Sequence, residues 1–284
     1  MNRKAIRYTI YRTVSSLTLT AAPIVTAQWL VDHVDMVLVV DTRRVSDYLD
    51  GHVPGALSFP LGTLIVEDTR ESELRSLGAA ARSALAARGI DADSHIVLID
   101  DNDGSASVGT FICELAGVRA VSAVHGGVRA WLHAGQDLHV APTDRAATTF
   151  TGETNLTTVA SFEDVVRAEQ SGVRLVDTRS QLEHEGIVGS PCCQYRGHIP
   201  GSVNLEWSQL LAATGDLHGP DRIRAAAHDV GLSENDEIIV YCHTGQRSAV
   251  AGLALRAAGF TRVRNFLGSW HEWSHRGMPS NTDA

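Results

Sequence analysis

Short runs of apolar residues alternate along the chain with longer amphipathic stretches. The apolar runs lie at residues 36–40, 96–99, 173–176 and 237–241. Each is expected to be a strand, and the stretches Glu73 to Arg88 and Arg222 to Val230 are expected to be helices. Strands that are apolar along their whole length are typical of parallel sheets covered on both faces. The pattern therefore predicts an α/β fold, in which a mostly parallel sheet carries helices on both faces.

Four blocks of sequence occur twice, in the same order in each half of the chain. The copies lie between 136 and 146 residues apart. The pairs are Val39 to Arg43 with Leu175 to Arg179, Gly51 to Ala56 with Gly197 to Ser202, Ile96 to Asp101 with Glu237 to Cys242, and Gly126 to Trp131 with Gly268 to Trp273. Such an ordered repeat indicates that one α/β unit is duplicated in tandem.

The chain of 284 residues is long enough for two domains, each with its own core. We expect a leader at 1–22, a first domain at 23–140, a linker at 141–157 and a second domain at 158–284. The linker is rich in small polar residues and shows no periodicity. Serine and threonine residues interrupt the apolar stretch of the leader, which favours a non-essential leader over a cleaved secretory signal.

Composition excludes several classes of function. The formal net charge of −9 and the lack of a basic run make nucleic acid an unexpected partner. No apolar run approaches the roughly 18 to 20 residues of a membrane span, so no membrane partner is expected either. Four cysteines are too few for a disulfide scaffold, and their spacing matches no zinc motif. A reducing, cytoplasmic location follows from that cysteine usage.

One loop has the sequence features of a catalytic site. It consists of Cys242, His243, Thr244, Gly245, Gln246 and Arg247. The loop follows an apolar strand and precedes a helical stretch at Ser248 to Ala258. At such a turn, backbone N–H groups and the helix N-terminus favour the thiolate, which is the nucleophilic form of cysteine. Cys242 is therefore expected to be the catalytic nucleophile rather than a small buried hydrophobe.

The rest of the loop, from His243 to Arg247, is expected to bind substrate. Gly245 allows the tight curvature. Arg247 is a natural partner for an anion, the alternative being an ordinary surface charge. His243 either tunes the electrostatics at the mouth of the site or faces water.

The first copy serves as an internal control. Aligning Gly104 with Gly245 places Asp101 opposite Cys242 and Ala106 opposite Arg247. The first copy therefore keeps the turn but lacks both the nucleophile and the cation. We expect the first domain to be catalytically inactive and to cover and shape the site of the second.

The second copy also contains an insertion. Asp177 and Gly197 are separated by 20 positions, whereas the matching residues of the first copy are separated by 10. The inserted residues include Cys192 and Cys193, and adjacent cysteines rarely form a disulfide with ease. The two interpretations are a passive loop and a mobile loop whose two cysteines take part in the reaction as a resolving or accepting pair.

Several other repeated residues are expected to be structural rather than catalytic. They are Asp177, Arg179, His198, Trp270 and Trp273. The first two follow an apolar strand, where short polar side chains commonly cap a turn. The tryptophans are expected in the core, with a position in the wall of the site as the alternative.

Together these features resemble the tandem-domain rhodanese family, the thiosulfate and 3-mercaptopyruvate sulfurtransferases. The resemblance runs from about Pro23 to the end and rests on the Asp-Thr-Arg, Gly-His-Ile-Pro-Gly-Ser and Gly-Ser-Trp-His-Glu-Trp elements and the Cys242 loop. It implies that Cys242 accepts a sulfane sulfur as a persulfide and passes it to a thiophilic acceptor such as cyanide or a thiol. It further implies that the backbone of His243 to Arg247 holds the outer sulfur. No metal and no organic cofactor are implied.

The donor is inferred from departures within the resemblance. The mercaptopyruvate branch usually has a Cys-Gly-Ser-Gly-Val-Thr loop and an arginine where this chain has Glu183. Both departures, and the positive charge of Arg247, favour thiosulfate as donor. Glu183 also stands where thiosulfate enzymes often have a cation.

Three alternatives compete with this prediction. Two are a 3-mercaptopyruvate sulfurtransferase and a persulfide carrier or binding module that serves a protein partner. The third, a rhodanese-related dual-specificity phosphatase, is disfavoured because four residues separate Cys242 from Arg247, where a phosphate-binding loop needs five.

Overall fold

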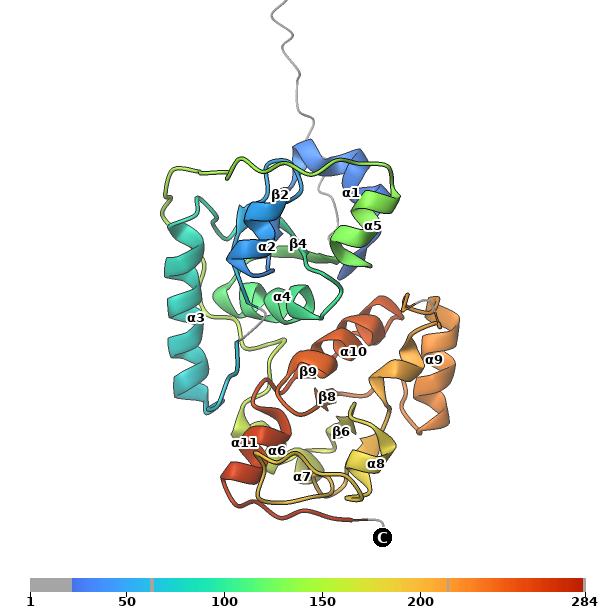
Figure 1. The fold of residues 1–284 in the computed structure, drawn as a ribbon. Coiled ribbons are helices and arrows are strands. Elements are labelled where there is room, and N and C mark those ends of the chain that lie inside the picture. Colours follow the sequence, from blue (N-terminus) through green and yellow to red (C-terminus); the bar gives the residue numbers. More distant parts are fainter. Residues whose placement is uncertain (1–21, 62–63, 214, 283–284) are drawn as a thin grey trace, which may run out of the picture.

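The computed structural model describes residues 22–61, 64–213 and 215–282, which form two α/β units (Figure 1). The first sheet has the order β1 (Ile24–Val25), β5 (Ala120–Val124), β4 (His95–Ile99), β2 (Leu38–Asp41), β3 (Leu57–Ser58). The second has the order β7 (Val203–Asn204), β6 (Arg174–Asp177), β8 (Ile238–Tyr241), β9 (Val263–Asn265). Neighbouring strands in both sheets are parallel. The predicted fold class is confirmed.

Helices cover both faces of the first sheet. They are α1 (Ala27–His33), α2 (Val45–Asp50), α3 (Glu71–Ala86), α4 (Ser105–Ala116) and α5 (Gly127–His133), with the 3-10 helix η1 (Val34–Met36). Side chains alternate between the two faces of a sheet along each strand, so neighbouring residues of β2 belong to different hydrophobic cores. Val40 packs in a cluster with Leu74 of α3 and Phe111 of α4. Val39 packs on the other face with Leu30 of α1 and Trp131 of α5.

The second sheet repeats this arrangement. Its helices are α6 (Phe162–Val166), α7 (Ala168–Ser171), α8 (Gln181–His184), α9 (Pro220–Asp229), α10 (Gln246–Ala257) and α11 (Ser269–His275), with the 3-10 helix η2 (Trp207–Leu210). Val240 of β8 belongs to the core with Ile223 of α9 and Leu255 of α10. Ile239, the residue before it, faces the core that contains Trp270 of α11. Trp270 and Trp273 are both buried, as expected for core residues.

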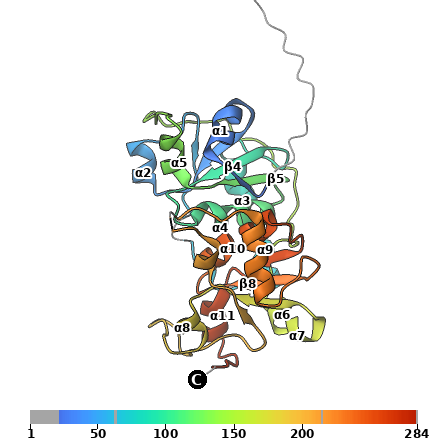
Figure 2. The ribbon, with the colours of Figure 1, turned by 90° about the vertical axis from the view of Figure 1, so that its right-hand side faces the viewer.

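The two units pack against each other through α4 and α10, which lie side by side in both views (Figures 1 and 2). Ala249 and Leu253 of α10 share a hydrophobic cluster with Phe111 of α4. Arg256 of α10 donates two hydrogen bonds to the Glu114 carboxylate, at 2.9 and 2.6 Å. The first unit therefore lies directly against the helix that follows the predicted catalytic loop.

Two sequence expectations concern segments outside the regular elements. The expected leader at 1–22 lies outside the described residues, apart from Ala22. Residues 141–157 contain no helix or strand, and Thr148 and Asn155 hydrogen-bond the backbone of the first unit. Within the described part of the chain, no helix combines the length and apolarity needed to cross a bilayer.

A buried ion pair recurs at the same place in each unit. Arg179 donates to the Asp177 carboxylate and to the carbonyl oxygen of Gly197, at 2.6 and 2.7 Å for the shortest contacts. Arg43 makes the same contacts with Asp41 and Gly51 in the first unit. Because the pair is present in both units, it supports the fold rather than one unit's chemistry.

Candidate functional site

Cys242 is held rigidly at the carboxyl end of the central strand β8. Its side chain is buried, and its backbone N–H donates to Ser269 Oγ at 3.1 Å. The carbonyl oxygen of Cys242 accepts a hydrogen bond from the backbone N–H of Trp270 at 3.0 Å. The first residues of α11 therefore hold both the backbone N–H and the carbonyl oxygen of Cys242 in place.

The turn after Cys242 requires a glycine. Gly245 is the N-cap of α10 and has φ of +86°, in the left-handed region. A Cβ atom there would lie 2.6 Å from the carbonyl oxygen of Leu267. The turn is further held by Asn265, whose Nδ2 donates to the carbonyl oxygen of Gly245 at 3.1 Å.

Sequence reasoning missed a hydroxyl group close to the sulfur of Cys242. Ser248 Oγ lies 3.6 Å from Cys242 Sγ and donates to Asn265 Oδ1 at 2.7 Å. The Ser248 hydroxyl therefore lies between the Cys242 sulfur and an amide oxygen that can only accept a hydrogen bond. Ser248 was named from sequence only as the first residue of the helical stretch. Its position in the first turn of the following helix was the available signal.

The residue at the position of Cys242 in the first unit is Asp100, which corrects the sequence alignment. Strand pairing sets Ile99 opposite Asp41, and Tyr241 opposite Asp177, so the next residues are Asp100 and Cys242. The expectation that Asp101 holds this place was wrong. It failed because the first unit has one more residue than the second between the strand end and the left-handed glycine that begins the helix.

The backbone N–H groups of the loop in the first unit point at the Asp100 carboxylate. It accepts hydrogen bonds from the N–H groups of Asn102, Gly104 and Ala106, at 2.8, 3.1 and 3.1 Å. Burial raises the pKa of Asp100 to about 6, against the effect of those three donors. The strand-to-helix turn of this fold therefore converges its N–H groups on an anion at the first residue after the strand.

Arg247, the expected anion partner, is already paired. Its guanidinium donates to both carboxylate oxygens of Glu183, at 2.8 and 3.0 Å. Burial opposes ionisation of Glu183, but the hydrogen bonds and charge of Arg247 outweigh it and lower the pKa of Glu183 to about 2. The loop therefore presents less net positive charge than its sequence indicates.

The remaining loop residues point in different directions. Gln246 Nε2 donates to the carbonyl oxygen of Asp103, at 2.8 Å, so the first unit touches this loop. Thr244 is partly exposed.

His243 lies against the insertion. Burial, together with the charges of His271 and Arg247, lowers the pKa of His243 and favours its neutral form. Its Nε2 contacts the sulfurs of Cys192 and Cys193, at 3.3 and 3.4 Å. The insertion thus folds over the catalytic loop.

The residues expected to be structural form a buried frame below the loop. The Asp177 carboxylate accepts the hydroxyl proton of Tyr241 at 3.1 Å. The Arg179 guanidinium lies 4.5 Å from the centre of the Trp270 ring. His198 stacks on His184 with ring centres 3.8 Å apart. These contacts agree with the expected structural roles.

Comparison with known proteins identifies relatives over nearly the whole chain. The family described as "Rhodanese-like domain" matches residues 26–134 and again 162–276. The 3-mercaptopyruvate sulfurtransferase of Escherichia coli K12 is 28% identical over 265 residues, which is 88% of this chain and 94% of that protein. A Saccharopolyspora erythraea protein named "Putative thiosulfate sulfurtransferase" is 28% identical over 234 residues, covering 80% and 83%. The crystal structure of a 3-mercaptopyruvate sulfotransferase from Escherichia coli aligns with a TM-score of 0.70 at 26% identity, covering 88% and 99%.

Proposed function

The chain belongs to the rhodanese family, and from this premise we propose that it is a thiosulfate sulfurtransferase that carries sulfur on Cys242. The second domain carries out the reaction and the first is catalytically inactive, since Asp100 stands where the nucleophile would be. We place the domains at 23–140 and 158–284, joined by a linker at 141–157. The two family matches fall within these bounds.

The correspondence of Asp100 with Cys242 is the observation that carries the proposal. The N–H groups of Gly104 and Ala106 converge on the Asp100 carboxylate. Their counterparts after Cys242 are Gly245 and Arg247, because α4 and α10 begin in the same way. The backbone from His243 to Arg247 thus stabilises an anion at Cys242, first as thiolate and then as persulfide.

The reaction follows from that geometry. The Cys242 thiolate attacks the outer sulfur of thiosulfate, the sulfur–sulfur bond of the donor breaks, and sulfite leaves with the bonding electron pair. The enzyme then holds a persulfide whose negative charge lies on the outer sulfur, toward the loop N–H groups. Cyanide or a thiolate attacks that sulfur, takes it away as thiocyanate or a new persulfide, and returns Cys242 to the thiolate.

The nature of the donor rests on charge. Thiosulfate is a dianion, and Arg247 is the cation that closes the loop. Glu183 balances that cation, which favours a second candidate, 3-mercaptopyruvate, a monoanion and the substrate named for the Escherichia coli relative. That donor would pass its sulfur to the same Cys242 thiolate and leave pyruvate.

Steady-state kinetics separate the two donors. We expect thiocyanate to form from thiosulfate and cyanide with a larger kcat/KM than from 3-mercaptopyruvate and cyanide, and Cys242→Ser to form none from either. A larger kcat/KM for 3-mercaptopyruvate would reassign the donor and leave Cys242 as carrier. Turnover by Cys242→Ser would remove the proposal altogether.

A further inference from the structure

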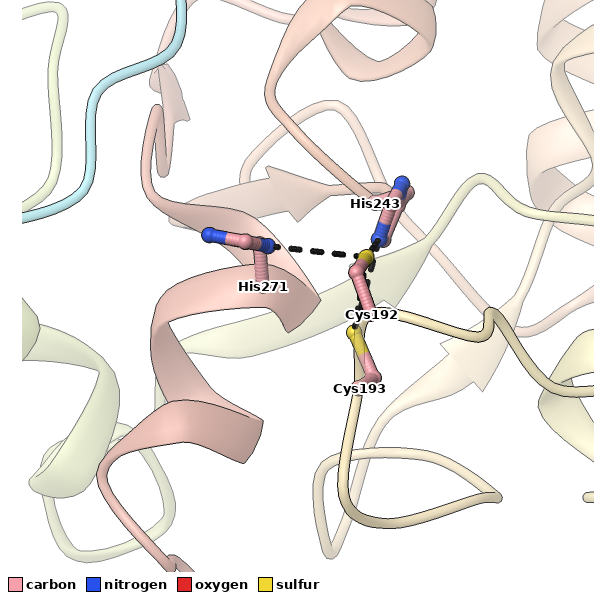
Figure 3. Close-up of side chains that lie close together, drawn as sticks. All are labelled: Cys192, Cys193, His243 and His271. Atoms are coloured by element: carbon pink, nitrogen blue, oxygen red, sulfur yellow. Dashed lines mark hydrogen bonds between the residues drawn. The ribbon is translucent and has the colours of Figure 1, made fainter.

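Two cysteines and two histidines from three separate segments converge beside the catalytic loop (Figure 3). Cys192 and Cys193 come from the insertion, His243 directly follows Cys242, and His271 lies in α11. One ligand atom from each lies within 4.8 Å of the other three. We propose that this cluster is a tetrahedral site for a thiophilic cation, with Zn²⁺ as its natural fit.

Four of the six distances between the ligand atoms lie within about 0.4 Å of those in such a site, and all six are within 4.8 Å. Zinc binds sulfur at about 2.3 Å and nitrogen at about 2.0 to 2.1 Å, so a tetrahedral Cys2His2 site separates two sulfurs by about 3.8 Å and a sulfur from a nitrogen by about 3.5 Å. The sulfurs of Cys192 and Cys193 are 3.9 Å apart. His243 Nε2 lies 3.3 and 3.4 Å from them, and His271 Nδ1 lies 3.9 Å from Cys192 Sγ.

The protonation states of the histidines also suit a metal. A ligating imidazole must be neutral, with a free lone pair on the nitrogen that faces the ion. Burial lowers the pKa of both His243 and His271. Their segments are held together by a hydrogen bond of 2.9 Å from the His271 N–H to the His243 carbonyl oxygen. Two of the four ligands are thus positioned before any ion binds.

The two cysteines supply the negative charge that balances a divalent cation. Neither cysteine is in a disulfide, and Cys193 is partly buried. A divalent cation replaces the protons of both cysteines, binds two thiolates and two neutral imidazoles, and releases two protons. The resulting centre is electrically neutral, which limits the cost of placing it in a half-buried site. Cys192 is exposed and leaves the ion a way in.

A bound ion would join two segments of the second domain beside its catalytic loop. An ion there would tie the insertion to His243, one residue from the nucleophile. The first unit lacks the insertion, so the site is particular to the unit that carries Cys242. It does not depend on which sulfur donor the enzyme uses.

Co²⁺ is the probe that tests this site, since it reports both geometry and ligand type. Reduced, metal-free protein is titrated with Co²⁺, and absorbance is followed in the thiolate charge-transfer and d–d regions. We expect one equivalent to give intense tetrahedral bands with thiolate charge transfer, and Zn²⁺ to displace it. The double variant Cys192→Ser/Cys193→Ser should lose the bands and bind at least about a hundredfold more weakly.

Two single variants serve as controls. Cys113→Ser removes a buried thiol of the first unit, and Cys242→Ser removes the nucleophile. Both should retain the bands, and His271→Ala should weaken them. Zn²⁺ should also raise the thermal unfolding midpoint of the wild type but not of the double variant, because an ion that binds only the folded state stabilises it. Bands that are missing from the wild type, that persist in the double variant, or that vanish in Cys242→Ser would each overturn the proposal.

Discussion

Arg247 and Glu183 face each other through two parallel hydrogen bonds, 64 residues apart in the chain. The cation that closes the catalytic loop is therefore bound to a carboxylate before any substrate arrives. This pairing sets the charge that an anionic donor meets.

Replacing Glu183 with glutamine should strengthen thiosulfate binding. The change leaves Arg247 unbalanced, so we expect KM for thiosulfate to fall about threefold to tenfold at low ionic strength, with a smaller change in kcat. Glu185→Gln makes the same change in net charge two residues along the chain from Glu183, at a side chain that contacts Gln181 instead of Arg247. Equal KM values for the two variants would show that only overall charge matters.

The same ion pair predicts a pH dependence of stability. The pKa of Glu183 is lowered in the folded protein to about 2 from an ordinary value of 4.5. The pair therefore stabilises the fold fully above about pH 4.5, and the contribution disappears as the pH falls toward 2. We expect urea unfolding to show the wild type about 1 kcal/mol more stable than Glu183→Gln at pH 6, after allowance for solvent screening. A difference that does not shrink in acid would contradict the assignment.

Gly245 should be irreplaceable. An alanine there would combine a left-handed φ with a contact of 2.6 Å to the Leu267 carbonyl oxygen, and the shift needed to relieve it would misplace the loop. We expect kcat/KM to fall by about a hundredfold. Gly259, at the other end of α10, has φ of +105° and no atom near its Cβ position. Gly259→Ala should cost about 1 kcal/mol of stability and leave turnover unchanged. Similar turnover in both alanine variants would refute this role.

Much of the architecture was predictable because it depends on local pattern. The apolar runs became β2, β4, β6 and β8, and Ser248 to Ala258 proved to be most of α10. The hydrophobic pattern of such a segment is a strong indicator of its secondary structure. The placement of Asp101 failed for a different reason: a single glycine was used to align loops that differ in length. Strand register, which only the structure supplies, identifies Asp100 instead.

The contacts around the site were less accessible from sequence. Glu183 and Arg247 lie far apart in the chain, and only the fold brings α8 beside the start of α10. The pairing of Cys192 with His243 depends on how an insertion folds back, for which no periodicity exists. His271 was read only as part of a tryptophan-rich closing element. Its place beside the insertion follows from the way α11 packs on the loop.

The most direct test of the account is the intact mass of the protein after incubation with thiosulfate, and again after cyanide, beside Cys242→Ser. We predict that the wild type gains the mass of one sulfur atom and loses it to cyanide, and that Cys242→Ser gains none. A wild type that gains no sulfur from thiosulfate or 3-mercaptopyruvate, or a serine variant that gains it equally, would contradict the claim that Cys242 is the sulfur carrier.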